Sequence, residues 1–369
     1  MASVIATIAG LVLISISTLT LLMLNCTGVI SLNDEGRCRD WSVVQTHAQE
    51  ISEPVSVLFV GDMMFGRDVE SVSKRRTGYT YPFARTLDIL QSADITMGNL
   101  ESPLTPGDSV VTESMVFRAD TEWAQALADA GFDVVGLANN HLPNQGSDGI
   151  WDTLEALDAA GIAHTGAGMD RIEAESPAIR RVRDLTVAFL AYNDTDVVPD
   201  SYFSGDEHAG TALMDIEMMQ TAVGAVRDLA DVVIVTMHAG NEYVPLPSVR
   251  QTDFAHAAID AGADLVIGHH PHVVQTAEVY RGKYIFYSLG NYIFDQMWSV
   301  DTRRGIALDI TLDHEAVVDV RVIPVEIDDY SQPHLISDPV IARQILDRLA
   351  LDYLLDESEC HEYYCAGRL

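Results

Sequence analysis

Lysine is nearly absent from this chain, and its scarcity limits what the protein can bind. Only Lys74 and Lys283 occur in 369 residues, so arginine supplies almost all of the positive charge. The 22 basic residues are opposed by 55 acidic ones, which gives a formal net charge of −33. A surface this negative repels nucleic acid and anionic lipid headgroups, and we therefore exclude nucleic acid as a partner.

Cysteine is scarce as well. The four cysteines, Cys26, Cys38, Cys360 and Cys365, lie near the two ends of the chain. A site in the central part of the sequence therefore contains no thiol. An even number of cysteines suits disulfides formed in an oxidising compartment, with Cys360 and Cys365 as one pair. Unpaired terminal thiols are the alternative.

Positive charge is missing from the N-terminus, where no Lys or Arg precedes Arg37. The segment from Val4 to Leu24 contains no charge and is long enough to cross a bilayer. A cleaved signal peptide usually has a shorter apolar stretch behind a positive start. We therefore predict a transmembrane anchor over residues 1–25 and a polar tether over 26–53. Arg37 and Arg39 follow the span, which by the positive-inside rule argues against export of the rest.

Valine-rich apolar runs dominate the remaining sequence and predict an α/β fold. Each run is short and β-branched, as in strands buried on both faces. They occupy residues 55–62, 93–101, 132–141, 186–194, 231–243, 263–272 and 283–291. Helical patterns over 121–131, 149–161 and 248–262 lie between several of them. Strand alternating with helix predicts a layered domain over residues 54–330.

The C-terminal part has a different pattern. Residues 305–327 alternate apolar and polar side chains and predict two antiparallel strands. Residues 338–356 have the periodicity of an amphipathic helix, so we expect a C-terminal helical extension over 331–369.

Residues able to bind metal or transfer protons follow five of the apolar runs. They are Asp62, Asn99 with Glu101, Asn139 to His141, His238 with Glu242, and the run Gly268-His269-His270-Pro271-His272. In open α/β sheets the ligand site lies outside the carboxyl ends of the strands. Taken singly, each of these residues also has a purely structural explanation, as a turn residue, a helix cap or a histidine of the core. Together the five strand ends predict one shared metal site.

The chemistry of this set favours a particular kind of ion. Carboxylate, amide oxygen and imidazole together suit Mn, Fe or Zn better than Ca or Cu. Two divalent ions about 3.5–4 Å apart would stabilise both the attacking and the leaving oxygen in a displacement reaction at phosphorus. A histidine that is not a ligand would act as general acid, and His141, beside Asn140, is the natural choice.

The ordered motifs "FVGDMMFGR", "GNLESPLT", "GLANNHLPNQGSDG", "MHAGNEY", "GHHPHVVQ" and "YSLGNYIFDQ" resemble the CapA/PgsA capsule-synthesis family. The resemblance runs from about Val55 to Arg321. It implies a membrane-anchored bacterial protein of poly-γ-glutamate synthesis or export, with a β-sandwich flanked by helices, similar to calcineurin-like metallophosphoesterases. It also implies other capsule-synthesis subunits and an anionic polymer as partners, and a soluble domain outside the cytoplasm.

The phosphoesterase pattern carries over residue by residue, with departures. Asp62 matches the first aspartate of an Asp-x-His motif, but Met64 stands where the histidine belongs. The resemblance implies metal ligation by Asp62, Asn99, Glu101, Asn140, His238, His270 and His272, with His141 as general acid. His269 has no counterpart. Because Met64 replaces a histidine ligand, one of the two metal sites is expected to bind its ion less tightly. We therefore expect one or two ions.

Two functions remain open from the sequence. One is a non-catalytic, anchored subunit of a polymer synthesis or export complex that retains a metal site. The other is an active metal-dependent hydrolase, such as a phosphoesterase, with no connection to capsule. The cluster Lys74-Arg75-Arg76 is a candidate binding site for an anionic polymer. The simpler interpretation is an ordinary solvated loop.

Overall fold

The computed structural model describes residues 53–108, 115–314, 316–355, 360 and 364–369. The predicted anchor and tether over residues 1–53 lie almost wholly outside this range. Among the helices of the described residues, none is long and apolar enough to cross a membrane.

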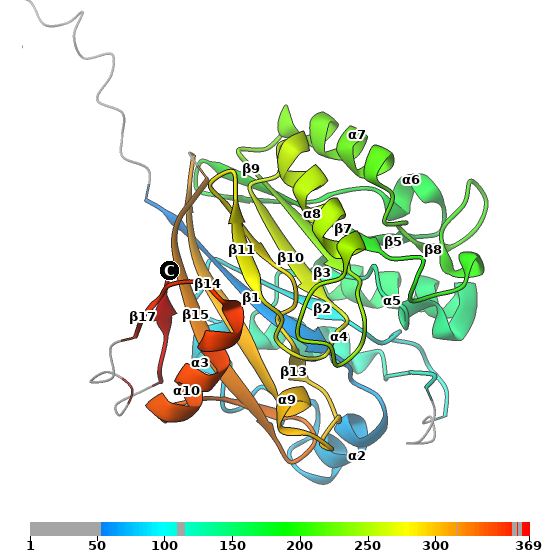
Figure 1. Ribbon diagram of the computed structural model, residues 1–369. Helices are drawn as coiled ribbons and strands as arrows, with labels where there is room; N and C mark the ends of the chain where they lie inside the picture. The colour runs from blue at the N-terminus through cyan, green and yellow to red at the C-terminus, as the bar shows by residue number, and fades with distance from the viewer. Residues whose placement is uncertain (1–52, 109–114, 315, 356–359, 361–363) are drawn as a thin grey trace, which may run out of the picture. The chain divides into compact units, whose positions relative to one another are not determined.

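Two large β-sheets form the centre of the domain (Figure 1). The first has the order β17-β18-β15-β14-β1-β2-β3-β4, with β13 added beside β1 and β16 beside β15. Its strands are β1 (Val55–Met63), β2 (Ile95–Leu100), β3 (Val134–Gly136), β4 (Ala163–Thr165), β13 (Asn291–Ile293), β14 (Arg304–Asp313), β15 (Ala316–Asp328), β16 (Gln332–Leu335), β17 (Leu354–Leu355) and β18 (Gly367–Arg368).

The second sheet has the order β11-β12-β10-β9-β7-β6. Its strands are β6 (Ala178–Val182), β7 (Leu185–Asn193), β9 (Val232–His238), β10 (Leu265–His269), β11 (Ala277–Tyr280) and β12 (Lys283–Phe286). A small separate sheet pairs β5 (Ala167–Gly168) with β8 (Gly210–Thr211). Strands β1 to β4 are mutually parallel, and so are β7, β9, β10 and β12.

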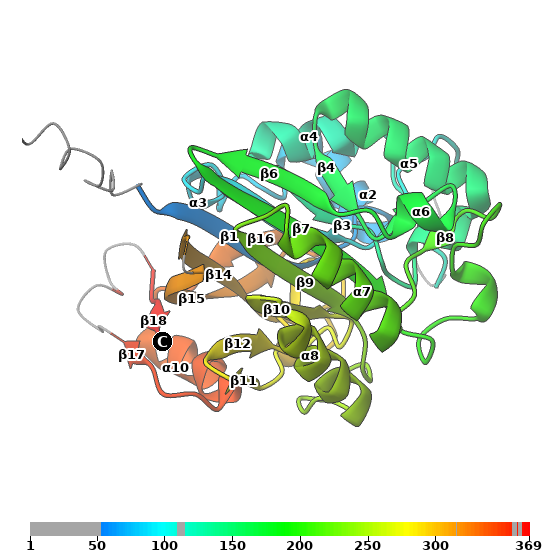
Figure 2. The same cartoon turned by 90° about the horizontal axis from the view of Figure 1, so that it is seen from above.

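Helices cover both outer faces of this sandwich, with α4 and α5 on one side and α7 and α8 on the other (Figures 1 and 2). The helices are α2 (Arg67–Arg75), α3 (Leu87–Leu90), α4 (Glu122–Ala130), α5 (Gly146–Ala160), α6 (Arg171–Ala174), α7 (Ile216–Arg227), α8 (Val249–Ala261), α9 (Val300–Arg303) and α10 (Pro339–Leu346). Short 3₁₀ turns are η1 (Gly78–Thr80), η2 (Leu142–Gln145), η3 (Asp200–Tyr202) and η4 (Asp347–Leu349).

Strand β1 shows why the apolar runs are continuous rather than alternating. Val57 and Phe59 point into the core between the two sheets, where the Phe59 ring lies 6.3 Å from that of Phe189. Leu58 and Val60 point the other way, into the core beneath the helices. Because successive side chains of a strand face opposite sides, burial on both faces requires every position to be apolar. The layered α/β prediction is confirmed.

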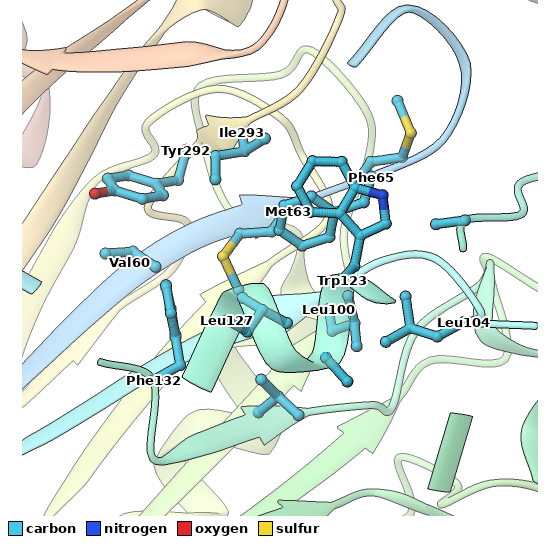
Figure 3. Packing of buried hydrophobic residues seen from close by; sticks show 14 of the residues in the cluster. Val60, Met63, Phe65, Leu100, Leu104, Trp123, Leu127, Phe132, Tyr292 and Ile293 are labelled. Carbon is cyan, nitrogen blue, oxygen red and sulfur yellow. The ribbon is translucent and has the colours of Figure 1, made fainter. Parts of the chain in front are cut away.

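The helix-side core of the first sheet packs around Trp123 of α4 (Figure 3). The Trp123 ring stacks on Phe65 with centroids 4.5 Å apart. Met63, Leu100 and Leu127 complete the surroundings of these rings. Since Met63 and Leu100 end β1 and β2, this packing fixes the strand ends from which the polar residues project.

The predicted antiparallel pair over 305–327 is confirmed as β14 and β15. The predicted C-terminal helix over 338–356 is wrong beyond Leu346, where α10 ends. Ala350 adopts a left-handed backbone with φ of 56°, which interrupts the helical path. The chain then returns to the first sheet as β17 and β18, with β18 paired to β15. The Cys360–Cys365 disulfide lies between these two strands.

Candidate metal centre

The structure brings all of the predicted strand-end residues to one place. Asp62, Asn99, Glu101, Asn139, Asn140, His141, His238, His270 and His272 lie around one centre, and all except the half-buried Asn140 are buried. They come from both sheets, because β1, β2 and β3 end beside β9 and β10. In the register of the first sheet Asp62 pairs with Asn99, and in the second His238 pairs with His269. The predicted convergence of strand ends is therefore confirmed.

Glu101 is the most informative residue of the centre. Its Oε1 atom is buried and has no hydrogen-bond partner. Three imidazole Nε2 atoms surround it, at 3.6 Å from His272, 3.9 Å from His141 and 4.0 Å from His238. Ligand atoms that each lie about 2.1 Å from one ion are at most about 4.2 Å apart. The spacing fits a shared cation, which would satisfy the unpaired oxygen.

Asp62 is held ionised by its histidine neighbours. Burial alone would raise the pKa of its carboxyl, but the adjacent imidazoles of His269 and His272 outweigh burial and hold the pKa well below the usual range. His269 Nδ1 lies 3.1 Å from Asp62 Oδ1. His270 contributes through its backbone N–H, which donates to Asp62 Oδ2 at 3.2 Å. His269, which had no predicted role, thus contacts a candidate ligand.

Burial sets the charge of the other titratable groups. It raises the pKa of Glu101 well above its usual range, and the charges of Asp62 and Glu242 add to this effect. Burial lowers the pKa of His270 to about 3. Burial would also lower that of His272, but Glu101 and Asp62 raise it to about 9. A bound cation would favour the ionised form of the buried Glu101 carboxyl and the neutral form of the buried imidazoles.

Asn99 is turned the opposite way from the prediction. Its Nδ2 donates to Asp62 Oδ1 at 2.8 Å, while its Oδ1 accepts from Asn139 Nδ2 at 3.2 Å. The orientation of Asn139 is fixed, because its Oδ1 accepts the backbone N–H groups of His141 and Leu142. Asn99 therefore presents N–H rather than oxygen to the centre, and an N–H group does not bind a cation. Its position indicates that it orients Asp62 and is not itself a ligand.

Asn140 does present its oxygen. The Oδ1 atom lies 2.9 Å from His238 Nε2, and His270 Nδ1 lies 3.1 Å from the same nitrogen. His238 Nδ1 lies 3.3 Å from Asn99 Nδ2, a donor, so Nδ1 accepts. The remaining ring nitrogen, Nε2, faces the amide oxygen and the second histidine. Because Nδ1 accepts, the neutral ring carries its proton on Nε2, which donates to Asn140 Oδ1, and Nε2 would bind an ion only after releasing that proton.

The tautomer of His141 follows from its partners. Asn144 Oδ1 accepts the backbone N–H of Phe117 at 2.8 Å, which identifies that atom as oxygen. His141 Nδ1, 2.9 Å from the same oxygen, therefore carries the proton. His272 Nδ1 similarly donates to Asn291 Oδ1 at 2.9 Å. In His141 Nε2 keeps its lone pair toward Glu101, as in metal sites where a second group fixes the imidazole, whereas the raised pKa of His272 leaves its Nε2 protonated until a cation replaces that proton.

Two groups of three residues place ligand atoms within 4.8 Å of one another. One group is Asp62, Glu101 and His238, and the other is Glu242, His270 and His272. Glu242 belongs to the motif "MHAGNEY" but was not among the predicted ligands. Two adjacent groups fit the expectation of one or two ions. The residues present suit the mixed oxygen and nitrogen coordination of Mn, Fe or Zn.

Met64 does not contribute to either group. Its side chain is fully buried in the helix-side core, and its sulfur accepts the backbone N–H of Gly66 at 3.0 Å. The position where the resemblance expects a histidine is thus filled by a core residue.

A cavity of about 240 Å³ opens beside the centre. It is lined by Arg67, Met115, Phe117, His141, Glu242, Tyr243, His272, Gln296 and Trp298. The Phe117 ring stacks on the His141 imidazole with centroids 3.7 Å apart, and the Arg67 guanidinium lies 5.1 Å from the Phe117 centroid. Met115, Phe117 and Trp298 were not predicted from the sequence, because they lie outside the quoted motifs.

The backbone is strained around this cavity. Four residues here have left-handed φ angles: Arg67 (52°), Tyr243 (63°), His270 (95°) and His272 (58°). Such angles cost roughly 1–3 kcal/mol each in residues other than glycine and concentrate at functional sites. Asp295 accepts two hydrogen bonds from the Arg67 guanidinium, at 3.0 and 2.7 Å, which holds that residue in place.

The basic cluster at residues 74–76 ends helix α2 rather than forming a loop. Lys74 pairs with Glu70 at 3.0 Å and also with Asp120, and Arg76 pairs with Asp329 at 2.7 Å. Acidic partners thus neutralise two of its three charges.

Comparison with known proteins gives a consistent family. Residues 56–296 match the family described as bacterial capsule synthesis protein PGA_cap. The capsule biosynthesis protein CapA of Bacillus anthracis is 32% identical over 309 residues, which cover 82% of this chain and 74% of that protein. The PGA biosynthesis protein CapA of Bacillus subtilis (strain 168) is 32% identical over 312 residues, covering 84% and 80%.

Similarity to solved structures is more distant. The sulfate thiohydrolase SoxB of Thermus thermophilus aligns with a TM-score of 0.44 at 13% identity, covering 79% of this chain and 57% of that one. This similarity supports no statement about chemistry. The family match spans most of the domain and contains every strand end of the candidate centre, so the chain belongs to the family of bacterial capsule synthesis proteins, PGA_cap.

Proposed function

We propose that this protein is a membrane-anchored component of poly-γ-glutamate capsule synthesis or export, and that its folded domain carries a divalent-metal centre. Family membership and the names of the two CapA relatives support the biological role. The metal centre rests on one observation, the buried and unpartnered Glu101 Oε1 with three imidazole nitrogens within 4.0 Å.

The residues that would hold the ion or ions are Asp62, Glu101, Asn140, His238, His270 and His272, with Glu242 as an additional carboxylate. A bound Mn, Fe or Zn ion would supply Lewis-acid polarisation of an oxygen in the adjoining cavity. Asn99, Asn139 and Asn291 orient the ligands through hydrogen bonds.

Anchoring through Val4–Leu24 stays a proposal, since the segment lies outside the described residues. The Cys360–Cys365 disulfide supports an extracytoplasmic domain, because disulfides persist in oxidising compartments and are rare in the cytosol.

The anionic polymer is proposed to meet the protein at the metal centre. A chain of net charge −33 repels a polyanion over most of its surface. The basic cluster offers little attraction because Lys74 and Arg76 are paired. Binding that depends on bound cations overcomes this repulsion locally.

Complementation of a deletion strain tests the proposal. Wild type and the control His256→Ala, a histidine paired with Glu278 outside the centre, are expected to restore surface polymer. His270→Ala/His272→Ala is expected to restore less than about a tenth. Full restoration by the double variant would contradict a role for the centre, and failure of wild type would contradict the capsule role.

A second candidate is a metal-dependent hydrolase, similar to a metallophosphoesterase, with a substrate unrelated to capsule. It is favoured by His141, which lines the cavity, has Nε2 3.9 Å from Glu101 Oε1, and is held by Phe117 and Asn144. There it would exchange a proton with a bound group. His141→Ala would then abolish hydrolysis of a phosphoester panel while metal content stays within about 20% of wild type. Equal turnover in both proteins would contradict this candidate.

A further inference from the structure

A second hollow lies between α6 and α7, and it shares no residue with the metal cavity. Its volume is about 700 Å³, and an adjoining hollow of about 400 Å³ shares Arg171, Glu175 and Met218 with it. The metal centre makes no use of this surface.

The groove has an apolar floor that is open along α7. Ile172, Pro177, Ala222 and Val226 line it, and Ile172 is 80% exposed. The lining positions Thr221 and Ala225 are also exposed. Helix α7 has 12 residues, which is about 18 Å at 1.5 Å per residue. A shallow groove of this length fits a rod-like segment better than an enclosed small molecule.

The charge of the groove is negative. Glu175, Asp215 and Glu217 line it, and Arg171 is the one cation among its described lining residues. Arg171 already pairs with Asp206 at 2.7 Å. The surface therefore favours a positively charged partner.

Two buried polar atoms near the groove have no hydrogen-bond partner. One is Oε1 of Glu175, which lines both hollows, and the other is the hydroxyl of Tyr192. Tyr192 is 1% exposed and belongs to the same core cluster as Ala174 of α6 and Met219 of α7. Burial raises the pKa of Tyr192, and the charge of Glu175 adds to this effect, so the two groups are close. Glu175 as a whole is half-buried and lines both hollows, so its carboxyl group adds negative charge to the groove.

We propose that this groove binds an amphipathic helix of a partner protein, with apolar residues at i, i+3, i+4 and i+7 on the floor and a Lys or Arg side chain that donates to Glu175. Helix-in-groove recognition uses this spacing. The charge complementarity and the open apolar floor identify this occupant. The inference is independent of the metal centre.

A synthetic peptide tests the inference with the full-length chain in detergent at physiological salt. The probe is a fluorescein-labelled 16-residue helix with leucines at this spacing and flanking arginines. A scrambled peptide of the same composition is the comparison, since a protein of net charge −33 attracts any cation. Fluorescence anisotropy is expected to give a Kd at least about tenfold lower for the helix.

Variants locate the binding. Glu175→Gln and the exposed Ala225→Arg are each expected to raise the Kd of the helical peptide by about tenfold. Glu155→Gln, an exposed acid of α5 with the same change in charge as Glu175→Gln, is expected to leave the Kd unchanged. Ala225→Arg touches no buried group, so it keeps the test valid if Glu175→Gln fails to fold. Equal binding of the scrambled peptide, or an unchanged Kd for Ala225→Arg, would overturn the inference.

Discussion

At the scale of single residues, amides decide which atoms face the candidate ion. The Asn139 side chain makes four hydrogen bonds, two through Oδ1 from the His141 and Leu142 N–H groups and two through Nδ2 to Asn99 Oδ1 and the Leu100 carbonyl. Because its orientation is fixed, that of Asn99 is fixed too, and Asn99 in turn orients Asp62. Groups that orient ligands in this way matter nearly as much as the ligands.

Gly268, before the histidine run, makes a prediction at this scale. A Cβ atom there would lie 1.9 Å from the Tyr287 carbonyl oxygen. Gly268→Ala is therefore expected to lower the free energy of unfolding by about 3 kcal/mol or more, because backbone must move. Gly224→Ala in α7, where a Cβ meets nothing within 4 Å, is the matched control and should stabilise by about 0.5–1 kcal/mol. Urea unfolding measures both, and equal stability of the two variants would contradict the account.

At the scale of elements, ion pairs and a hydrogen bond to Asp120 connect helix α2 and the turn after it to the segment before α4. Lys74 of α2 contacts Asp120, Tyr79 donates to Asp120 at 2.7 Å, and the buried Arg118 pairs with Asp120 at 2.8 Å. Burial would raise the pKa of Asp120, but the hydrogen bonds from Lys74 and Tyr79 lower it to about 2. The carboxylate thus stabilises the folded state only while it is ionised.

Asp120→Asn is expected to cost about 1–2 kcal/mol of unfolding free energy at pH 7. The folded pKa lies below the unfolded value of about 3.9, so the stabilisation is complete above pH 5 and is lost as pH falls toward 2. Urea titrations of both proteins at pH 7, 5 and 3 measure the difference. A difference that grows between pH 5 and pH 3 would contradict this assignment.

The disulfide makes a second prediction for an element. Cys360 and Cys365 are buried in the core between the sheets, and the Cys365 N–H donates to the Ile336 carbonyl at 2.8 Å. Replacing both cysteines by serine is expected to cost about 2 kcal/mol, as for a short closed loop. Thermal unfolding with and without reductant provides the check. If the unfolding temperature of the wild type is the same with and without reductant, a structural role for the disulfide is contradicted.

At the scale of the whole molecule, the sequence predicted the layers and the place of the site better than its details. Apolar runs buried on both faces identify parallel strands, and the carboxyl ends of such strands meet at one edge, so Asp62, Glu101 and His238 were predictable. The amide orientation of Asn99 was not, because it depends on Asn139, which lies 40 residues away.

Long-range pairing also explains the C-terminal error. The helical periodicity of residues 338–356 continues past Leu346, but β15 offers an open edge to which β18 hydrogen-bonds. Strand pairing between segments distant in the sequence thus outweighs the local helical periodicity. Glu242 was named with His238 among the metal-capable strand-end residues but was left out of the ligand set, and Asn291 was overlooked. Nothing in the local sequence of either residue distinguishes a ligand, or the partner of one, from a loop residue.

The metal centre is the central feature of the proposed function, and metal content tests it most directly. Plasma mass spectrometry on full-length wild type is expected to find about one to two equivalents of Mn, Fe or Zn per chain. His270→Ala/His272→Ala should retain less than about a fifth of this, while His256→Ala should match wild type. Absence of metal from wild type, or equal content in the double variant, would contradict the metal centre.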